Sequence, residues 1–253
     1  MTHRAAAVIG LGNLGRLYAG GWLRAGYAVH PIGRRTDARA VLNGLPERTP
    51  LLCAVGEASL ANAVEAVPPA RRGDLIFVQN ELFPEDLQRL GTPDATIAVV
   101  WTLVKAGFPL ILGRRLAVTG PQEEAFAEAC AALEHPVLAG APIGWECATK
   151  YAFIVAMNAL GLLRADTLGA WLADDPERVE ALIADACRVA LARIGAPETD
   201  LARAVAEVAE GVEGFRALPC RGRSSAARVA RALNTAETLG IHIPALRDAA
   251  EAS

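Results

Sequence analysis

Residues 5–15 read AAAVIGLGNLG, an apolar run followed at once by a turn rich in glycine. An apolar run without alternation is typical of a parallel strand that is covered on both faces. The turn has the spacing GxGxxG: the first glycine makes the tight turn, the second lets a pyrophosphate approach, and the third permits close helix–strand packing. The helix expected to follow, to about residue 25, would direct its N-terminal amides at the phosphates. The stretch therefore predicts a dinucleotide site formed by Gly10, Leu11, Gly12, Asn13, Leu14 and Gly15.

The end of the second expected strand, at residues 27–32, bears on the choice of cofactor. Chains that bind NAD usually carry an acidic residue there, which holds the ribose 2′-hydroxyl. This chain has Arg34 and Arg35 instead, and its first carboxylate is Asp37. Guanidinium groups can hold a 2′-phosphate through paired hydrogen bonds. The pattern favours NADP, and the alternative is that both arginines are solvated loop residues.

The pattern beyond this point predicts an α/β fold. Strand-like stretches alternate with helical spacers, which indicates a doubly wound parallel sheet of the Rossmann type. Further strands are expected at 51–55, 74–78 and 96–103, and helices at 59–67 and 126–133. Two short stretches, 109–112 and 116–119, are expected to pair as a hairpin through Gly113, Arg114 and Arg115.

The sequence from residue 145 onward lacks a convincing strand and predicts a helical domain. Helical patterns cover residues 146–163, 177–194, 199–216 and 225–239. The boundary is expected within residues 139–142, which read AGAP. The organisation is therefore a dinucleotide-binding domain at 1–140, followed by a helical domain at 141–253.

Composition excludes several classes of function. The net charge of −3 and the scattered basic residues argue against nucleic-acid binding. The five cysteines form no CxxC pair and have no histidine at ligand spacing, which indicates buried thiols in a reducing cytoplasm and no metal site. The longest apolar stretch, 151–163, is too short to cross a membrane. We expect a cytoplasmic protein that acts on a small molecule.

The order of motifs along the chain resembles that of the ketopantoate reductases (2-dehydropantoate 2-reductases). The motifs are the glycine turn, the arginines after the second strand, Gln79-Asn80, the Gly120-Pro121 segment, and Lys150 opening an apolar helix that contains Asn158. The resemblance runs from residue 5 to about Pro244, and only the combination of these short motifs is specific. It implies an NADP-dependent oxidoreductase of a carbonyl substrate and allows for a homodimer.

The resemblance also implies roles for individual residues. Asn80 matches an asparagine that lies beside the nicotinamide and the substrate. Lys150 matches the catalytic lysine, which hydrogen-bonds the ketone oxygen and donates its proton. Asn158 matches a substrate-binding asparagine, and Ser224 and Ser225 match a hydroxyl-bearing segment used on the polar end of the substrate.

Four positions depart from the family pattern, and they indicate a changed substrate. Ile154 replaces an asparagine one turn after Lys150, Ala226 stands where a glutamate is expected, Glu81 replaces a glycine, and Gly56-Glu57 replaces a lysine. A pocket that hydrogen-bonds its substrate is not easily converted to apolar side chains unless the substrate differs. The sequence therefore leads to the hypothesis of an NADPH-dependent reductase of a 2-keto acid or related carbonyl compound. The alternatives are a non-catalytic NADP(H)-binding redox sensor and a dehydrogenase of imines or 3-hydroxy acids.

Overall fold

The computed structural model describes residues 4–104, 110–114 and 116–252. The chain divides into two compact units, Met1–Ile143 and Gly144–Ser253. Each unit has its own helices and its own candidate site residues.

The first unit is built on a seven-stranded sheet with the strand order β2-β1-β3-β4-β5-β8-β9. Its strands are β1 (Ala5–Ile9), β2 (Ala28–Ile32), β3 (Leu51–Cys53), β4 (Leu75–Phe77), β5 (Thr96–Val99), β8 (Leu116–Thr119) and β9 (Val137–Ala139). The first five are parallel, whereas β8 is antiparallel to β5, and β9 runs parallel to β8. The Rossmann prediction is confirmed, with the correction that the last two strands reverse direction.

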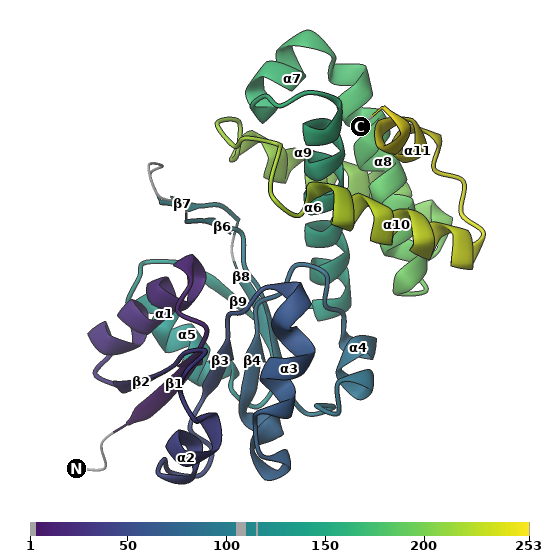
Figure 1. The fold of residues 1–253 in the computed structure, drawn as a ribbon. Coiled ribbons are helices and arrows are strands. Elements are labelled where there is room, and N and C mark those ends of the chain that lie inside the picture. Colours follow the sequence, from purple (N-terminus) through teal and green to yellow (C-terminus); the bar gives the residue numbers. More distant parts are fainter. Residues whose placement is uncertain (1–3, 105–109, 115, 253) are drawn as a thin grey trace. The chain divides into compact units, whose positions relative to one another are not determined.

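Helices cover both faces of this sheet (Figure 1). They are α1 (Asn13–Arg24), α2 (Ala38–Asn43), α3 (Leu60–Glu65), α4 (Pro84–Arg89) and α5 (Glu123–Ala131), with 3₁₀ turns at Glu57–Ser59 and Pro69–Asp74. Alternate strand residues point to the same face, so Val8, Leu52 and Ile76 join one core with Trp22 and Phe126 of α1 and α5. The short helices α2 and α4 were not expected from the sequence, since six residues give too little periodicity to recognise.

The expected hairpin of 109–112 with 116–119 is wrong. The chain instead forms a separate two-stranded ribbon, in which β7 (Ile111–Leu112) pairs antiparallel with β6 (Thr102–Leu103). The Gly113 amide donates to Trp101 O at 2.8 Å, so this glycine continues the ribbon rather than making a turn. The expected strand 96–103 is thus two strands, β5 and β6. Apolar periodicity identifies a strand but not its partner, which is why the pairing was mistaken. Pro109 and Arg115 lie outside the described residues.

The second unit is helical, as predicted. Its helices are α6 (Ile143–Leu163), α7 (Leu168–Asp174), α8 (Pro176–Arg193), α9 (Leu201–Glu213), α10 (Ser225–Leu239) and α11 (Pro244–Glu251), with a 3₁₀ turn at Glu198–Asp200. Helix α10 has the bounds expected from the sequence, whereas the short helices α7 and α11 were missed. Most of α6 is buried, so it forms the centre of this unit. Among the described residues, no helix is long and apolar enough to cross a lipid bilayer.

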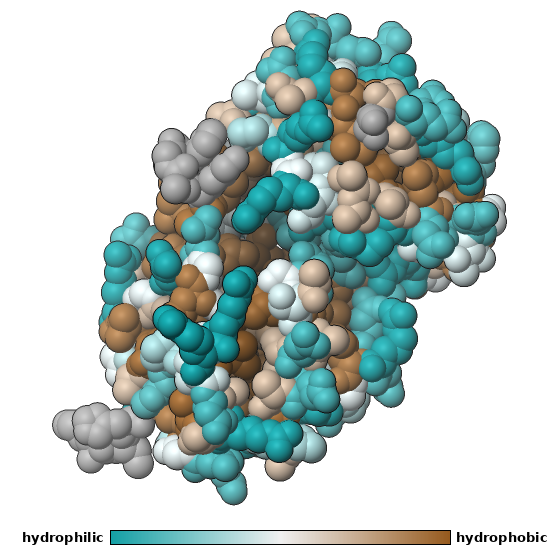
Figure 2. Space-filling model, viewed as in Figure 1, coloured by the Kyte–Doolittle hydropathy of each residue, from teal (hydrophilic) through white to brown (hydrophobic). Residues whose placement is uncertain are grey.

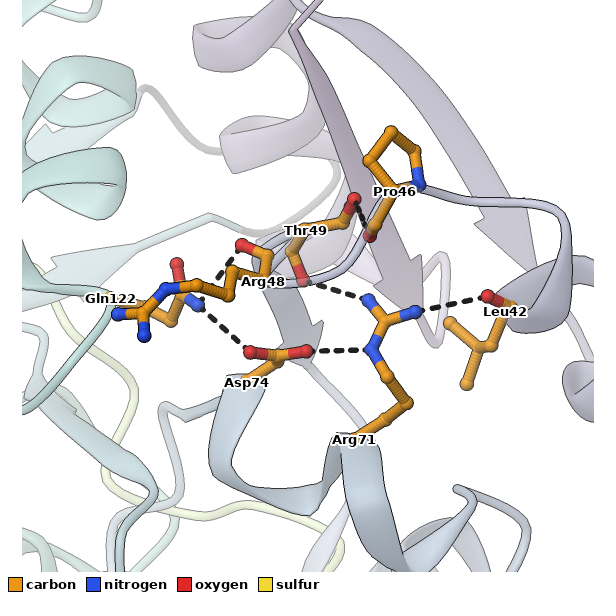
Figure 3. Close-up of polar contacts among 7 residues, drawn as sticks. All are labelled: Leu42, Pro46, Arg48, Thr49, Arg71, Asp74 and Gln122. Atoms are coloured by element: carbon orange, nitrogen blue, oxygen red, sulfur yellow. Dashed lines mark hydrogen bonds and ion pairs between the residues drawn. The ribbon is translucent and has the colours of Figure 1, made fainter.

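A partly buried polar network joins segments at the amino-terminal edge of the first unit's sheet (Figure 3). Arg71 Nε donates to Asp74 Oδ2 at 2.7 Å, and Arg71 Nη1 donates to Leu42 O at 3.0 Å. Gln122 Nε2 donates both to Asp74 Oδ1 and to Arg48 O, each at 3.2 Å. The network joins the segments before β3, before β4 and before α5, on the edge opposite the glycine turn.

The surface in the space-filling view is mostly hydrophilic, with smaller apolar patches (Figure 2). The large apolar side chains exposed in the described part of the chain are Leu11, Leu23, Leu110, Leu138 and Leu239. Leu11 belongs to the glycine turn, where an exposed apolar side chain is available to contact a ligand.

Candidate functional site

The glycine turn has the geometry that its spacing predicts. Gly10 has a φ of 93°, and a Cβ there would lie 2.9 Å from Ala54 O. A Cβ on Gly15 would lie 2.0 Å from Gly10 O, so this glycine lets α1 pack directly on the turn. A Cβ on Gly12 would have no atom within 4 Å. The backbone at Gly12 therefore faces open space at the start of α1, where a pyrophosphate could approach it.

The start of α1 is suited to an anion. Its N-cap residue, Gly12, supplies no side-chain cap, and its first turn carries no acidic residue. The first amides of a helix have no intrahelical partner, and they lie at the positive end of the helix dipole. Leu14 packs against the core instead of facing solvent. The backbone and dipole at this position fit the phosphates of a dinucleotide.

The Asn13 side chain contacts a distant segment. Its Nδ2 donates to Val104 O at 2.7 Å, which joins the glycine turn to the end of β6. The sequence led us to expect Asn13 in the cofactor site. Because its side chain is bonded to Val104 O, only the Asn13 backbone, in the first turn of α1, is left to contact a phosphate.

Arg34 and Arg35 lie in an exposed turn directly after β2. The turn is closed by Thr36, whose amide donates to Gly33 O and whose Oγ1 accepts from the Gly33 amide, both at 3.1 Å. No ion pair or hydrogen bond links either guanidinium to another described residue. Asp37, the first carboxylate after these arginines in the sequence, accepts a hydrogen bond from the Ala40 amide and caps α2. Both guanidinium groups are thus available to a 2′-phosphate.

Gln79 and Asn80 follow β4 at the same carboxyl edge of the sheet. Gln79 lies between the strands and holds carbonyl groups of the segment after β3. Asn80 is half-buried, and no described residue hydrogen-bonds its side chain. Ligands of open α/β sheets bind outside the carboxyl ends of the strands. Asn80 therefore lies on the edge that carries the glycine turn.

Lys150 is the buried cation of the second unit. It lies on α6 with 6% of its surface exposed, and its Nζ lies 5.1 Å from the centroid of the Phe153 ring and 5.9 Å from that of Phe215. Burial is the main cause that lowers the pKa of Lys150, the positive charge of Arg228 adds to the shift, and together they bring it to about 7. An amine with a pKa near neutrality can both give and accept a proton at physiological pH, which is what a general acid requires.

Asn158 and Ser225 form a hydrogen-bonded pair between α6 and α10. Ser225 Oγ donates to Asn158 Oδ1 at 2.7 Å and accepts from the Gly222 amide at 2.9 Å. Asn158 Nδ2 donates to Ile154 O at 2.6 Å. A Cβ on Gly161 would lie 2.5 Å from the Cys220 backbone, so that glycine lets the segment before α10 pack on α6. Much of the hydrogen-bonding capacity of the pair is used within the protein.

Ser224 does not join this pair. It is exposed, and its side chain makes no capping bond at the start of α10. Ala226, where the resemblance led us to expect a glutamate, is exposed as well. Ile154 lies one turn after Lys150 on α6 and is partly buried, so its apolar side chain occupies the place of the expected asparagine.

Sequence reasoning missed three residues around Lys150, namely Phe153, Phe215 and Arg228. One available signal concerned Lys150 itself: the chain has only two lysines, Lys105 and Lys150, among 25 basic residues. Arginine cannot give up its proton in proteins, so a lysine in an arginine-rich chain marks a position where deprotonation could matter.

The remaining titratable side chains of interest are the cysteines and the possible metal ligands. The described residues contain no group of three or more His, Cys, Asp or Glu side chains that could hold a metal ion. All five cysteines are buried and free, as predicted. Burial raises the pKa of the Cys53, Cys130, Cys187 and Cys220 thiols to about 12, which leaves them unreactive.

No protein-family model and no curated protein sequence matches this chain. Solved structures do match it over nearly its whole length. A 2-dehydropantoate 2-reductase from Methylococcus capsulatus has a TM-score of 0.69 at 17% identity, covering 98% of this chain and 94% of its own. A ketopantoate reductase from Ralstonia eutropha has a TM-score of 0.69 at 20% identity, with coverages of 98% and 96%.

A D-mandelate dehydrogenase, in a ternary structure with NADH and anilino(oxo)acetate, has a TM-score of 0.69 at 12% identity, with coverages of 98% and 96%. At these identities the likeness establishes the fold. The chain has the fold of the ketopantoate reductases and of D-mandelate dehydrogenase.

Proposed function

We propose that this protein is an NADPH-dependent reductase that converts a 2-keto acid, or a related carbonyl compound, into the alcohol. The observation that carries the proposal is Lys150, a buried amine with a pKa of about 7 on a helix of the second unit. The glycine turn of the first unit supports it, because its open backbone at Gly12 fits a dinucleotide. Similar folds occur in proteins described as 2-dehydropantoate 2-reductase and D-mandelate dehydrogenase.

The first unit would hold the cofactor. The start of α1 and the backbone at Gly12 would bind the pyrophosphate, and Arg34 and Arg35 would bind the 2′-phosphate that distinguishes NADP from NAD. Asn80, on the same sheet edge, would orient the nicotinamide end. When bound, NADPH would supply the hydride that adds to the carbonyl carbon.

Lys150 would supply the proton. As the carbonyl double bond is lost, its oxygen gains negative charge, and the Lys150 ammonium stabilises this charge and protonates the oxygen. The lysine leaves this step as a neutral amine, a form that its lowered pKa makes accessible near pH 7. Phe153 and Phe215 flank the amine and exclude water, which strengthens its interaction with the developing alkoxide.

The substrate side of the second unit favours an apolar substituent. Ile154 follows Lys150 by one turn, and the neighbouring polar groups of Asn158 and Ser225 bond each other. A substrate with several polar groups would leave some of them unpaired, at a cost of about 1–3 kcal/mol each. A 2-keto acid with an apolar or aromatic side chain suits the site better than ketopantoate. The ternary structure of D-mandelate dehydrogenase holds anilino(oxo)acetate, in which an aromatic ring is joined to an oxoacetate group.

The test is a panel of 2-keto acids assayed by oxidation of NADPH. We expect turnover on an apolar member, and a loss of about 10²–10⁴-fold in Lys150→Met, the usual effect of removing a positioned acid. Lys150→Arg keeps a positive charge but cannot transfer its proton, so it should be equally inactive. NADPH affinity should be unchanged in both variants. Wild-type turnover in Lys150→Met would remove Lys150 from the mechanism.

Ketopantoate tests the changed pocket. With two polar partners missing, its specificity constant should lie from about 30-fold to over a thousand-fold below that of the preferred substrate. Ile154→Asn should raise the value for ketopantoate, and a high value in the wild type would contradict the argument. Tight NADPH binding without turnover on any carbonyl compound would favour the redox sensor instead. Size-exclusion chromatography would test the homodimer.

A further inference from the structure

Both the nitrogen and the oxygen of the Gln79 side-chain amide are hydrogen-bonded at the end of β4. Its Nε2 donates to Cys53 O at 2.9 Å and to Val55 O at 3.1 Å. Its Oε1 accepts from the Val78 amide at 3.1 Å. Both acceptors on the nitrogen side are carbonyl oxygens, and the partner on the oxygen side is an amide. The network therefore fixes the orientation of the side-chain amide. In the flipped form, the oxygen would face two carbonyl oxygens and the NH₂ group would face the Val78 N–H.

The segment that Gln79 holds lies directly against the glycine turn. The Ala54 amide donates to Ile9 O at 2.8 Å, which extends the pairing of β3 with β1 up to the first glycine. A Cβ on Gly10 would lie 2.9 Å from Ala54 O and 2.9 Å from Val55 Cγ1. A displacement of this segment would therefore move the backbone of the glycine turn, or open a gap behind it.

The residue after Gln79 is Asn80, the expected nicotinamide contact. One side chain thus fixes the backbone on both sides: the segment after β3 through its nitrogen, and its own turn after β4 through its oxygen. The geometry points to Gln79 as a positioning residue, which holds residues 53–55 against Gly10 and so sets the glycine turn and Asn80 in one arrangement for dinucleotide binding. This inference rests on the proposed function.

Substitutions of nearly the same size separate the role of the amide from the role of its volume. Gln79→Met keeps the length but cannot donate. Gln79→Glu places a carboxylate against two carbonyl oxygens, which repel it; once protonated, it regains one O–H donor for one of those carbonyls. Other titratable groups on these segments are Cys53, Glu57 and Glu81. The Cys53 thiol stays neutral because burial raises its pKa to about 12.

The experiment measures the dissociation constant of NADP⁺ by calorimetry between pH 5.5 and 8.5, for the wild type and both variants. At each pH, the dissociation constant of the variant is divided by that of the wild type. This ratio cancels the effect of titration of the 2′-phosphate of NADP⁺, which is the same for both proteins. We expect both variants to bind roughly 5- to 100-fold more weakly at pH 8, in line with two lost hydrogen bonds. The ratio for Gln79→Glu should fall toward unity as the pH is lowered, whereas that for Gln79→Met should stay constant.

Gln88→Glu is the matched control, since it introduces the same charge on the exposed side of α4, and its ratio should stay at one. Thermal unfolding of each variant verifies that it is folded over the range tested. If both variants unfold at lower temperature but bind NADP⁺ as tightly as the wild type, Gln79 is only structural and the inference is overturned. If the Gln79→Glu ratio does not change with pH, the hydrogen-bond argument is overturned. A wild type that binds no NADP⁺ overturns the proposed function itself.

Discussion

Replacing Lys150 with methionine should stabilise the protein while removing the proposed proton donor. Burial is the main cause of the lowered pKa of Lys150, which falls from 10.5 to about 7. A buried ammonium has lost its water, and the nearby positive charge of Arg228 adds to the cost. Methionine has a similar length and no charge to desolvate, and it packs well against aromatic rings such as those of Phe153 and Phe215.

The magnitude follows from linkage between proton binding and folding. Because the folded pKa lies below the unfolded one, the unfolded chain binds the Lys150 proton more tightly, and the free energy of unfolding falls as the pH drops from about 10.5 to about 7. At ~1.4 kcal/mol per pH unit, this interval corresponds to a penalty of up to about 5 kcal/mol. The penalty is constant below pH 7, since the amine is then charged in both states, and it vanishes above pH 10.5.

Urea unfolding, followed by tryptophan fluorescence, measures the effect at pH 6, 7, 8, 9 and 10. We expect Lys150→Met to exceed the wild type by roughly 2–5 kcal/mol at pH 6 and 7, since lost cation–π contacts offset part of the gain. The difference should shrink steadily toward pH 10. Arg247→Met, which removes an exposed cation from α11 of the same unit, is the control and should change stability by less than about 0.5 kcal/mol.

Two results would refute the reasoning. A Lys150→Met variant that is no more stable than the wild type at pH 6 would mean that burial of the ammonium carries no net penalty in the folded protein. A stability difference that stays constant from pH 7 to pH 10 would mean that methionine acts through packing alone. Either result would also remove the basis for a proton donor with a pKa near 7.

Arg228→Gln should raise the pKa of Lys150, because it removes a neighbouring positive charge, and so shift the high-pH decline of kcat to higher pH; an unshifted profile would place Arg228 too far away to matter. Arg34→Ala should weaken NADPH binding by about 1.5–3 kcal/mol and leave NADH nearly unchanged, as measured by calorimetry with both cofactors; equal losses for the two would contradict a 2′-phosphate contact. Asp74→Ala should destabilise the first unit by about 3–5 kcal/mol in urea unfolding, since it leaves the largely buried Arg71 guanidinium without its carboxylate; a loss under about 1 kcal/mol would show that this network carries little stability.

The kind of fold and the position of the glycine turn could be predicted from the amino-acid sequence. The glycine spacing at residues 10–15 requires close backbone approach, and alternating strand and helix patterns require a covered parallel sheet. The long amphipathic pattern at 225–239 located α10 to the residue. These features are set by the spacing of residues close together in the sequence, so they can be predicted from the sequence alone.

The pairing of the strands and the surroundings of each candidate site residue depend on contacts between distant parts of the chain. Residues 116–119 pair with β5 rather than with 111–112, because strand partners depend on a whole sheet and not on one apolar run. Ser225 meets Asn158 across 67 positions of sequence, and Gln79 reaches Cys53 across 26. The pKa of Lys150 is set by burial and by Arg228, far along the chain. A residue's chemistry depends on solvent exclusion and on distant charges, which local sequence does not encode.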